Sequence, residues 1–298
     1  MSNFDLRDTD LIDEAALMHL SRDPHVAEVF SAEFADGVPV VRMEYFSKGS
    51  VESYAQGGAL NVRTALQIGT DAARGLHHLH VLGVIHRDIK ASNLLRTDSD
   101  RVKVADFGLA TRLGQDSDFS IAYMPHLAPE EIALGLRGSP AADQYALGVT
   151  IYRLLNGDNI FWSGFDKSKS SQPVLSRWLP HIHAPLQRVV KKATHRNPER
   201  RHESLASFRF ALEKVTPAIS WQVSPIHSGM EWFGTVHDVL CWRIVLTRSQ
   251  DWTVSAFKTT QSGRETRVLS ATKNFTLTTD AYSYCAMVLS RLAIAGRL

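Results

Sequence analysis

The stretch His86-Arg-Asp-Ile-Lys-Ala-Ser-Asn93, followed by Asp106-Phe-Gly108, decides the interpretation of this 298-residue chain. It places an aspartate, a lysine and an asparagine within six residues, and a second aspartate thirteen residues after the asparagine. The first piece alone would be an ordinary run of solvated charges, and the second alone would be an ordinary turn. In this order and at this spacing, the two pieces together are a specific signal of a chemical site.

With these motifs, the chain resembles the eukaryotic-type protein kinase family from about residue 10 to residue 215. The resemblance implies that Asp88 is the base that accepts the proton of the substrate hydroxyl, and that Lys90 neutralises the transferring phosphoryl group. It also implies that Asn93 and Asp106 hold Mg²⁺ at the phosphates of ATP. Phosphoryl transfer requires such residue types because it depends on charge compensation and in-line positioning more than on covalent help.

Three further landmarks of the family follow in order and imply structural supports. Ala128-Pro-Glu130 matches the end of the activation segment, and Asp143 matches the buried aspartate that holds the backbone of the catalytic loop. Arg201 matches the late arginine of the family that pairs with Glu130. Buried carboxylates need such partners, because an unpaired buried charge is strongly destabilising.

The stretch Met43-Glu-Tyr-Phe46 resembles the hinge between the two lobes of the family. The resemblance implies that backbone groups of Glu44 and Phe46 bind the adenine, that Met43 is the gatekeeper, and that Leu95 packs under the base. For Met43 and Leu95, a role as ordinary core residues stays equally open.

Two positions bear on specificity and regulation. In the family, a lysine at the position of Lys90 accompanies serine/threonine kinases more than tyrosine kinases. Arg87 before the catalytic aspartate implies control by a phosphorylated activation segment. The candidate acceptors are Thr111, Ser117 and Ser120. Tyr123 stands where the family usually has a threonine, which puts the substrate-docking surface in doubt.

The front of the family pattern is missing from the chain as written. The resemblance implies a Gly-rich loop over the phosphates and a third-strand lysine that pairs with a glutamate. Glu14 stands at the place of that glutamate, but the first lysine is Lys48, beyond the hinge. Either the chain truly lacks this cover, or its start was assigned at an internal methionine of a longer protein. We expect the second, and we expect the chain as written to have weak activity or none.

Composition excludes several other classes of protein. The chain has 33 Lys and Arg against 31 Asp and Glu, a net charge of +2, so binding of nucleic acid is not expected. Two cysteines, Cys241 and Cys285, cannot form a disulfide framework and suit a reducing compartment. The most apolar helical stretch, 281–296, is short for a membrane span and contains Arg291. We therefore expect a cytoplasmic protein that uses ATP and Mg²⁺ on a protein substrate; its oligomeric state stays open.

The hydrophobic spacing predicts an α+β chain in two parts. Helices are expected at 10–20, 62–82, 142–155, 185–193, 205–215 and 279–292, the last capped by Thr279 or Asp280. Strands are expected at 26–34 and 38–45, joined by Asp36-Gly37, and at 102–105, 242–247, 252–257 and 266–271. We expect a two-lobed, kinase-like domain at 1–216, with 1–46 as a partial N-lobe and 47–216 as a helical C-lobe. The composition changes after Pro217, so 217–298 is expected to be a small α+β domain of unknown role.

Histidines and tryptophans cluster in places that invite functional interpretations. The clustered histidines lie at positions 77, 78, 80, 181 and 183. No metal-binding spacing accompanies them, so we expect ordinary helix and loop histidines. Four tryptophans lie beyond Pro217, at positions 221, 232, 242 and 252, and we expect core residues there more than a base-stacking platform.

Three hypotheses about function follow. The first is an ATP- and Mg²⁺-dependent serine/threonine protein kinase with Asp88 as the base. The second is a pseudokinase or interaction scaffold in which the C-lobe and the tryptophan-rich tail bind partners. The third is a small-molecule phosphotransferase of the same fold, against which Lys90 and Ala128-Pro-Glu130 both count.

Overall fold

The computed structural model describes residues 22–35, 38–106, 111–112, 124–134, 138–164, 175–236, 239–260 and 262–298. Several expectations lie outside these residues: the helix at 10–20 with Glu14, the turn Asp36-Gly37, the acceptor candidates Ser117 and Ser120, and Tyr123. Among the described helices, none is long and apolar enough to cross a membrane.

The expected hairpin at the front is present. Strands β1 (Val29–Ala35) and β2 (Val38–Met43) pair antiparallel. The segment before β1 joins the rest of the molecule through β5 (Val102–Val104): the Ala27 N–H donates to the Val104 carbonyl at 2.8 Å, and the Val104 N–H donates to the His25 carbonyl at 2.8 Å. This close approach depends on Gly75, where a Cβ would lie 2.3 Å from the His25 oxygen.

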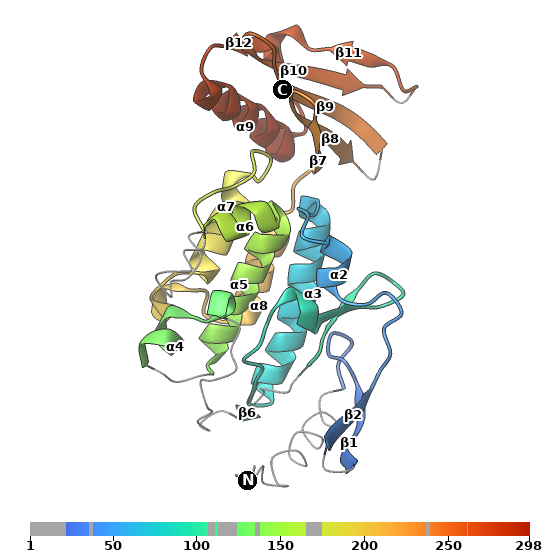
Figure 1. Cartoon of the computed structure of the whole chain (residues 1–298), viewed down its shortest axis with the longest axis vertical. Helices are drawn as coiled ribbons and strands as arrows, with labels where there is room; N and C mark the ends of the chain where they lie inside the picture. Colours follow the sequence, from blue (N-terminus) through green and yellow to red (C-terminus); the bar gives the residue numbers. More distant parts are fainter. Residues whose placement is uncertain are drawn as a thin grey trace.

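A helical region follows, built around two long helices, α3 (Val62–Val81) and α5 (Pro140–Asn156). Both begin at a side-chain cap: Asn61 accepts from the Thr64 N–H, and Ser139 accepts from the Ala142 N–H. The two helices run side by side in Figure 1. The other helices here are α2 (Val51–Ala55), α4 (Pro129–Leu134), α6 (Asp158–Ser163), α7 (Ala184–Ala193) and α8 (Leu205–Lys214).

The segments that connect α3 to α4 contain short paired strands. Strand β3 (Val84–Ile85) pairs with β6 (Thr111–Arg112), so the acceptor candidate Thr111 lies in a strand. Strand β4 (Leu94–Arg96) pairs with β5, which brings the segment after the catalytic loop beside the segment before Asp106.

The tail is an antiparallel sheet covered on one face by a helix, α9 (Thr278–Ala295). Its strands are β7 (Ser220–Ile226), β8 (Gly229–Val236), β9 (Val239–Arg248), β10 (Trp252–Thr259), β11 (Glu265–Arg267) and β12 (Lys273–Phe275). Trp221, Trp232 and Trp242 are buried in the core between sheet and helix, which confirms their expected role. Trp252 is only partly buried.

Two expectations for the tail are wrong in detail. The strand expected at 266–271 ends at Arg267, because Leu269–Ala271 form a 3₁₀ turn that returns the chain to β10 as β12. The helix expected at 279–292 begins at Thr278, and its N-cap is Leu277 without a side-chain hydrogen bond. The Thr278 hydroxyl instead accepts from the indole N–H of Trp252 at 3.0 Å.

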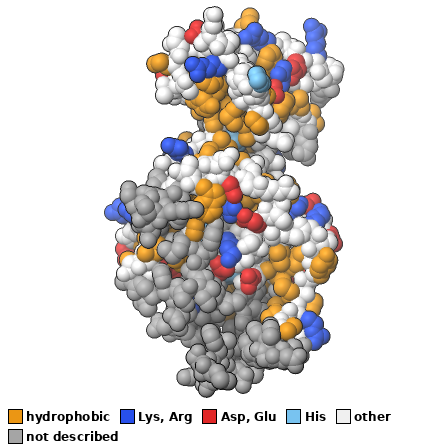
Figure 2. Space-filling model, in the orientation of Figure 1, with side chains coloured by type: hydrophobic (Ala, Val, Ile, Leu, Met, Phe, Trp, Pro, Cys, Tyr) orange, Lys and Arg blue, Asp and Glu red, His pale blue; other side chains and the backbone are white. Residues whose placement is uncertain are grey.

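The buried hydrophobic side chains form two separate clusters. The first runs from Val26 to Leu212, with Val215 packed against it, and the second from Ile219 to Ala293. Figure 2 shows a narrowing between the two parts of the molecule, which we call the neck and define as residues 215–220. The first part has the small β-sheet and larger helical region of an α+β, kinase-like fold.

Candidate active site

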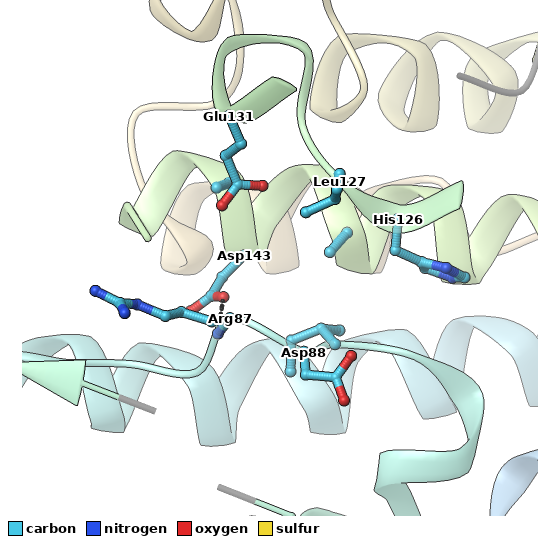
Figure 3. A pocket seen from close by; sticks show the side chains of 9 residues that line it. Arg87, Asp88, His126, Leu127, Glu131 and Asp143 are labelled. Atoms are coloured by element: carbon cyan, nitrogen blue, oxygen red, sulfur yellow. Dashed lines mark hydrogen bonds between the residues drawn. The ribbon is translucent and has the colours of Figure 1, made fainter. Parts of the chain in front are cut away.

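Asp143, in the first turn of α5, holds the backbone of the catalytic loop. Its carboxylate accepts hydrogen bonds from the N–H groups of His86 and Arg87, at 2.9 and 2.8 Å, and Figure 3 shows it pointing at this turn of the loop. A third contact of 2.8 Å joins it to Nε2 of His80, near the end of α3. The residue is 1% exposed; burial raises its pKa, but the hydrogen bond and charge of His80 outweigh this and lower it.

His86 ties the catalytic loop to the strand that precedes Asp106. Its Nε2 lies 3.0 Å from the carbonyl oxygen of Ala105, and the Ala105 N–H donates to the carbonyl of Asn93 at 2.9 Å. Burial lowers the pKa of His86, so the ring is neutral near pH 7. Two motifs that are distant in sequence are therefore fixed to each other by buried hydrogen bonds.

Asp88, Lys90 and Asn93 meet at a single carboxylate oxygen. The Lys90 ammonium donates to Asp88 Oδ2 at 2.7 Å, and the Asn93 amide donates to the same oxygen at 3.0 Å. The Asn93 amide also donates to the Asp88 carbonyl at 2.8 Å, and Asn93 is 4% exposed. The structure thus brings together all three expected catalytic residues.

Two residues at this site have left-handed backbones, which are unfavourable for residues other than glycine. Asp106 has φ 63° and presents an exposed side chain directly after β5 and Ala105. Arg87 has φ 71° and is buried. Its guanidinium packs against Gly138, where a Cβ would lie 2.3 Å from Nε. Residue 138 must therefore be glycine for Arg87 to lie where it does.

A small pocket opens beside Asp88, between the catalytic loop and the segment before α4 (Figure 3). His126 and Leu127 line it opposite Asp88. His126 is buried, and burial, together with the positive charges of Arg153 and Lys90, lowers its pKa to about 3. The wall of the pocket is thus uncharged at His126 near neutral pH.

Glu130 and Arg201 form a bidentate ion pair, with N–O distances of 2.6 and 2.7 Å. The Arg201 side chain is fully buried and also donates to the carbonyls of Ala141 and His195, at 2.8 Å each. The pair therefore fixes the start of α4 to the start of α5, where Asp143 lies.

Two contributors were not singled out from the sequence. His80, grouped with ordinary histidines, contacts Asp143 and so supports the catalytic loop. Glu131 accepts from the N–H groups of Ala128 and Gly138, at 2.9 and 3.1 Å, and so joins both ends of α4. Glu131 is the third residue of α4, where a glutamate can accept from the N–H of the residue before the helix, as in one half of a capping box; this position could be read from the sequence. No local pattern indicates the partner of His80, which is 63 residues away in sequence.

The expected hinge lies between β2 and α2. Met43 ends β2 and packs against the first hydrophobic cluster. The Glu44 N–H donates to the Glu28 carbonyl at 2.8 Å, and its carboxylate pairs with Lys103 at 2.7 Å. The side chain of Glu44 is therefore held to β5 by its ion pair with Lys103.

Two hinge groups are open for a ligand. Among the described residues, the Glu44 carbonyl accepts no hydrogen bond and the Phe46 N–H donates none. Leu95 lies in β4, opposite Lys103 of β5, and is partly buried. The hinge thus has one acceptor and one donor in the positions that the resemblance implies for adenine.

Comparison with known proteins agrees with this geometry. Residues 2–209 match the family described as "Protein kinase domain". Serine/threonine-protein kinase PknK of Mycobacterium tuberculosis is 31% identical over 186 residues, 61% of this chain and 16% of that protein. PknB of the same species is 31% identical over 219 residues (67% and 34%), and PrkC of Bacillus subtilis 27% over 192 residues (61% and 30%). The chain therefore spans 16–34% of the length of these curated relatives. This chain belongs to the protein kinase domain family.

Proposed function

We propose that the chain is a protein serine/threonine kinase that transfers the γ-phosphoryl group of ATP, with Asp88 as the base. The observation that carries the proposal is the meeting of Lys90 and Asn93 at Asp88 Oδ2, on a loop held by Asp143. The relatives named serine/threonine-protein kinase and the lysine at position 90 support serine and threonine as acceptors.

The two oxygens of Asp88 have different roles in this proposal. Oδ2 is occupied by Lys90 and Asn93, whereas among the described residues no hydrogen bond reaches Oδ1. Oδ1 accepts the proton of the substrate hydroxyl while the hydroxyl oxygen attacks the γ-phosphorus; the bond from that phosphorus to the β,γ-bridging oxygen breaks, and ADP leaves with its electron pair. Lys90, held beside the same carboxylate, compensates the negative charge of the transferring group.

The donor set near Asp88 fits Mg²⁺, which the kinase family uses with ATP. Asn93 supplies an amide oxygen and Asp106 an exposed carboxylate, and these hard oxygen ligands are the ones that Mg²⁺ prefers. When bound, Mg²⁺ neutralises charge on the phosphates. The hydrogen bond from the Ala105 N–H to the Asn93 carbonyl keeps the two ligands close.

Adenine binding is assigned to the hinge. The Glu44 carbonyl accepts from the exocyclic amine and the Phe46 N–H donates to a ring nitrogen, with Met43 and Leu95 as apolar neighbours. We further place the protein in the cytoplasm, because both of its cysteines are free. Its substrate is a protein.

The alternative is a pseudokinase or interaction scaffold of the same fold. Such a protein would bind a nucleotide or a partner without transferring phosphate. Binding and transfer must therefore be measured separately.

The test compares the chain with its Asp88→Asn form and with Asp251→Asn, a matched change at an exposed site in the tail. Transfer of labelled phosphate to a mixture of basic proteins, and binding of Mg²⁺-ATP by calorimetry, are followed together. We expect weak transfer by the unchanged chain, loss of that transfer to the background of the assay in Asp88→Asn with binding of Mg²⁺-ATP retained, and no change in transfer or binding in Asp251→Asn. Equal transfer by all three forms contradicts the proposal; binding without any transfer supports the alternative.

A further inference from the structure

The tail and the body share a buried hydrogen bond beside the neck. The indole N–H of Trp232, in β8, donates to Nδ1 of His181 at 3.2 Å. Trp232 is fully buried and His181 is 1% exposed, so water cannot replace either partner. Burial lowers the pKa of His181 to about 3, and its ring is therefore neutral and able to accept at Nδ1.

A second contact lies at the start of α3. Ser220 is the first residue of β7, and its hydroxyl donates to Oδ1 of Asn61 at 3.2 Å. Asn61 is the N-cap of α3, and the same oxygen accepts from the Thr64 N–H. The neck itself is fixed at both ends, because the Ala218 N–H donates to Ala293 of α9 and the Val215 carbonyl contacts His183. The tail is thus held by side chains as well as by the chain connection.

Both contacts lead to the catalytic loop along a helix. From Asn61, α3 extends 20 residues, about 30 Å at 1.5 Å per residue, and has His80 near its far end. From the His181 segment, the Leu179 N–H donates to Asn156, the last residue of α5. The first turn of α5 holds Asp143.

The far ends of the two helices meet. His80 of α3 contacts Asp143 of α5 at 2.8 Å, and Asp143 accepts from the N–H groups of His86 and Arg87. Figure 1 shows α3 and α5 side by side beneath the tail, with the tail at one end of both. The tail therefore contacts the catalytic loop indirectly by two routes, one along α3 and one through the Leu179–His181 segment and α5. The two routes meet at the contact between His80 and Asp143.

We propose that residues 217–298 are a regulatory partner of the kinase-like body, whose docking through Trp232 and Ser220 sets the order of the catalytic loop through α3 and α5. This goes beyond the proposed function, and its test needs no catalytic activity. The occupant of the body surface at His181 and Asn61 is the chain's own tail, and a ligand that moves the tail would alter the loop from about 30 Å away.

The test uses two matched tryptophan substitutions. Trp232→Phe removes the indole N–H that reaches His181. Trp221→Phe removes an equally buried indole in the same core whose N–H has no partner among the described residues. We expect Trp232→Phe to lower the melting temperature by about 2–10 °C more than Trp221→Phe, because it leaves a buried acceptor unsatisfied.

Amide hydrogen exchange gives the decisive readout. We expect Trp232→Phe to raise exchange of the His86 and Arg87 N–H groups by about 2- to 30-fold, and Trp221→Phe to leave it unchanged. Ser220→Ala is a milder change. We expect it to raise exchange of the His86 and Arg87 N–H groups by a smaller factor, and also to raise exchange of the Thr64 N–H. His181→Asn keeps a hydrogen-bond acceptor for Trp232, whereas His181→Leu does not. We therefore expect the exchange rates of His86 and Arg87 to change less in His181→Asn than in His181→Leu.

Two results would overturn the proposal. One is equal exchange of His86 and Arg87 in Trp232→Phe and Trp221→Phe. The other is additivity of Trp232→Phe and His181→Leu in a double-mutant cycle, because coupled partners must give a non-additive result. If Trp232→Phe does not fold, the comparison of Ser220→Ala with the unchanged protein decides the same question.

Discussion

The catalytic loop and the front hairpin differ in how firmly they are held. The loop is fixed by Asp143, His80 and His86, all buried or nearly so, and the carboxylate of Asp88 already has its hydrogen-bond partners in place. The hairpin exposes apolar side chains: Phe30 is 58% exposed and Val41 44%, and Figure 2 shows hydrophobic side chains gathered over this part of the molecule. The catalytic loop is thus preorganised by buried hydrogen bonds, while the hairpin leaves several apolar side chains exposed.

The largest expected effect is a loss of folding stability at acid pH, which acts on buried histidines in the firmly held part of the molecule. His126 and His181 have pKa values of about 3, lowered by burial, against 6.5 when unfolded. Because the unfolded chain binds these protons more tightly, stability is complete above pH 6.5 and is lost as pH falls toward 3. The loss is about 3 kcal/mol per histidine at pH 4. Urea unfolding at pH 7.5, 5 and 4 checks this, with His227→Gln as the exposed control. A flat profile over that range is the opposing outcome.

Removing Asp143, which holds the catalytic loop by hydrogen bonds, should lower the free energy of unfolding by nearly as much. Asp143→Ala leaves the N–H groups of His86 and Arg87 buried without their acceptor, and we expect a loss of about 3–5 kcal/mol in the free energy of unfolding. Asp100→Asn is the control, since its carboxylate is exposed and its ion pairs with Lys48 and Arg96 lie at the surface, so we expect a much smaller loss. Chemical denaturation measures both; similar losses would show that the buried network does not stabilise the loop.

An intermediate effect is expected where the hairpin segment meets the body. Gly75→Ala would gain about 1 kcal/mol of helix propensity in α3. It also places a Cβ 2.3 Å from the His25 carbonyl, a backbone atom that cannot rotate away. Overpacking of this kind costs about 1–3 kcal/mol, so we expect a net loss and faster exchange of the Ala27 N–H. An increase in stability would mean that the segment is not held against β5.

The smallest effect should come from the exposed face at the hinge, directly after the hairpin. Tyr45→Ser removes a side chain that is 88% exposed, and we expect a change within about 0.5 kcal/mol in thermal unfolding. Solubility at high protein concentration should rise. A large destabilisation would show that this face is packed in solution, and the contrast between the two halves would then be wrong.

The sequence predicted the parts of the molecule whose signals are local. The long helices around 62–82 and 142–155 repeat their apolar spacing over several turns and were expected within two residues of their observed ends. Asp88, Lys90 and Asn93 were expected at one site because their motif resembles that of the protein kinase family, and the structure brings them together. Short helices such as α2 and α6, with five and six residues, offer too few turns for periodicity to show.

Contacts between distant segments could not be predicted from spacing. His80 and His181 were expected to be ordinary histidines, and only the fold reveals their partners, Asp143 and Trp232. In the tail, β7 and β8 contain Pro225, Gly229 and Gly234, which obscure a strand pattern. Gly234 is needed because a Cβ there would lie 2.7 Å from the ring of Trp221.

The left-handed backbone at Asp106 has a consequence for selection. Glycine adopts φ 63° without penalty, whereas other residues in such conformations store roughly 1–3 kcal/mol. A mutant library enriched only for thermal stability should therefore gain glycine at position 106 and lose a carboxylate of the candidate metal site. A library enriched for phosphate transfer should keep the aspartate. The frequencies of this one codon after the two enrichments measure how strongly function opposes stability in this fold.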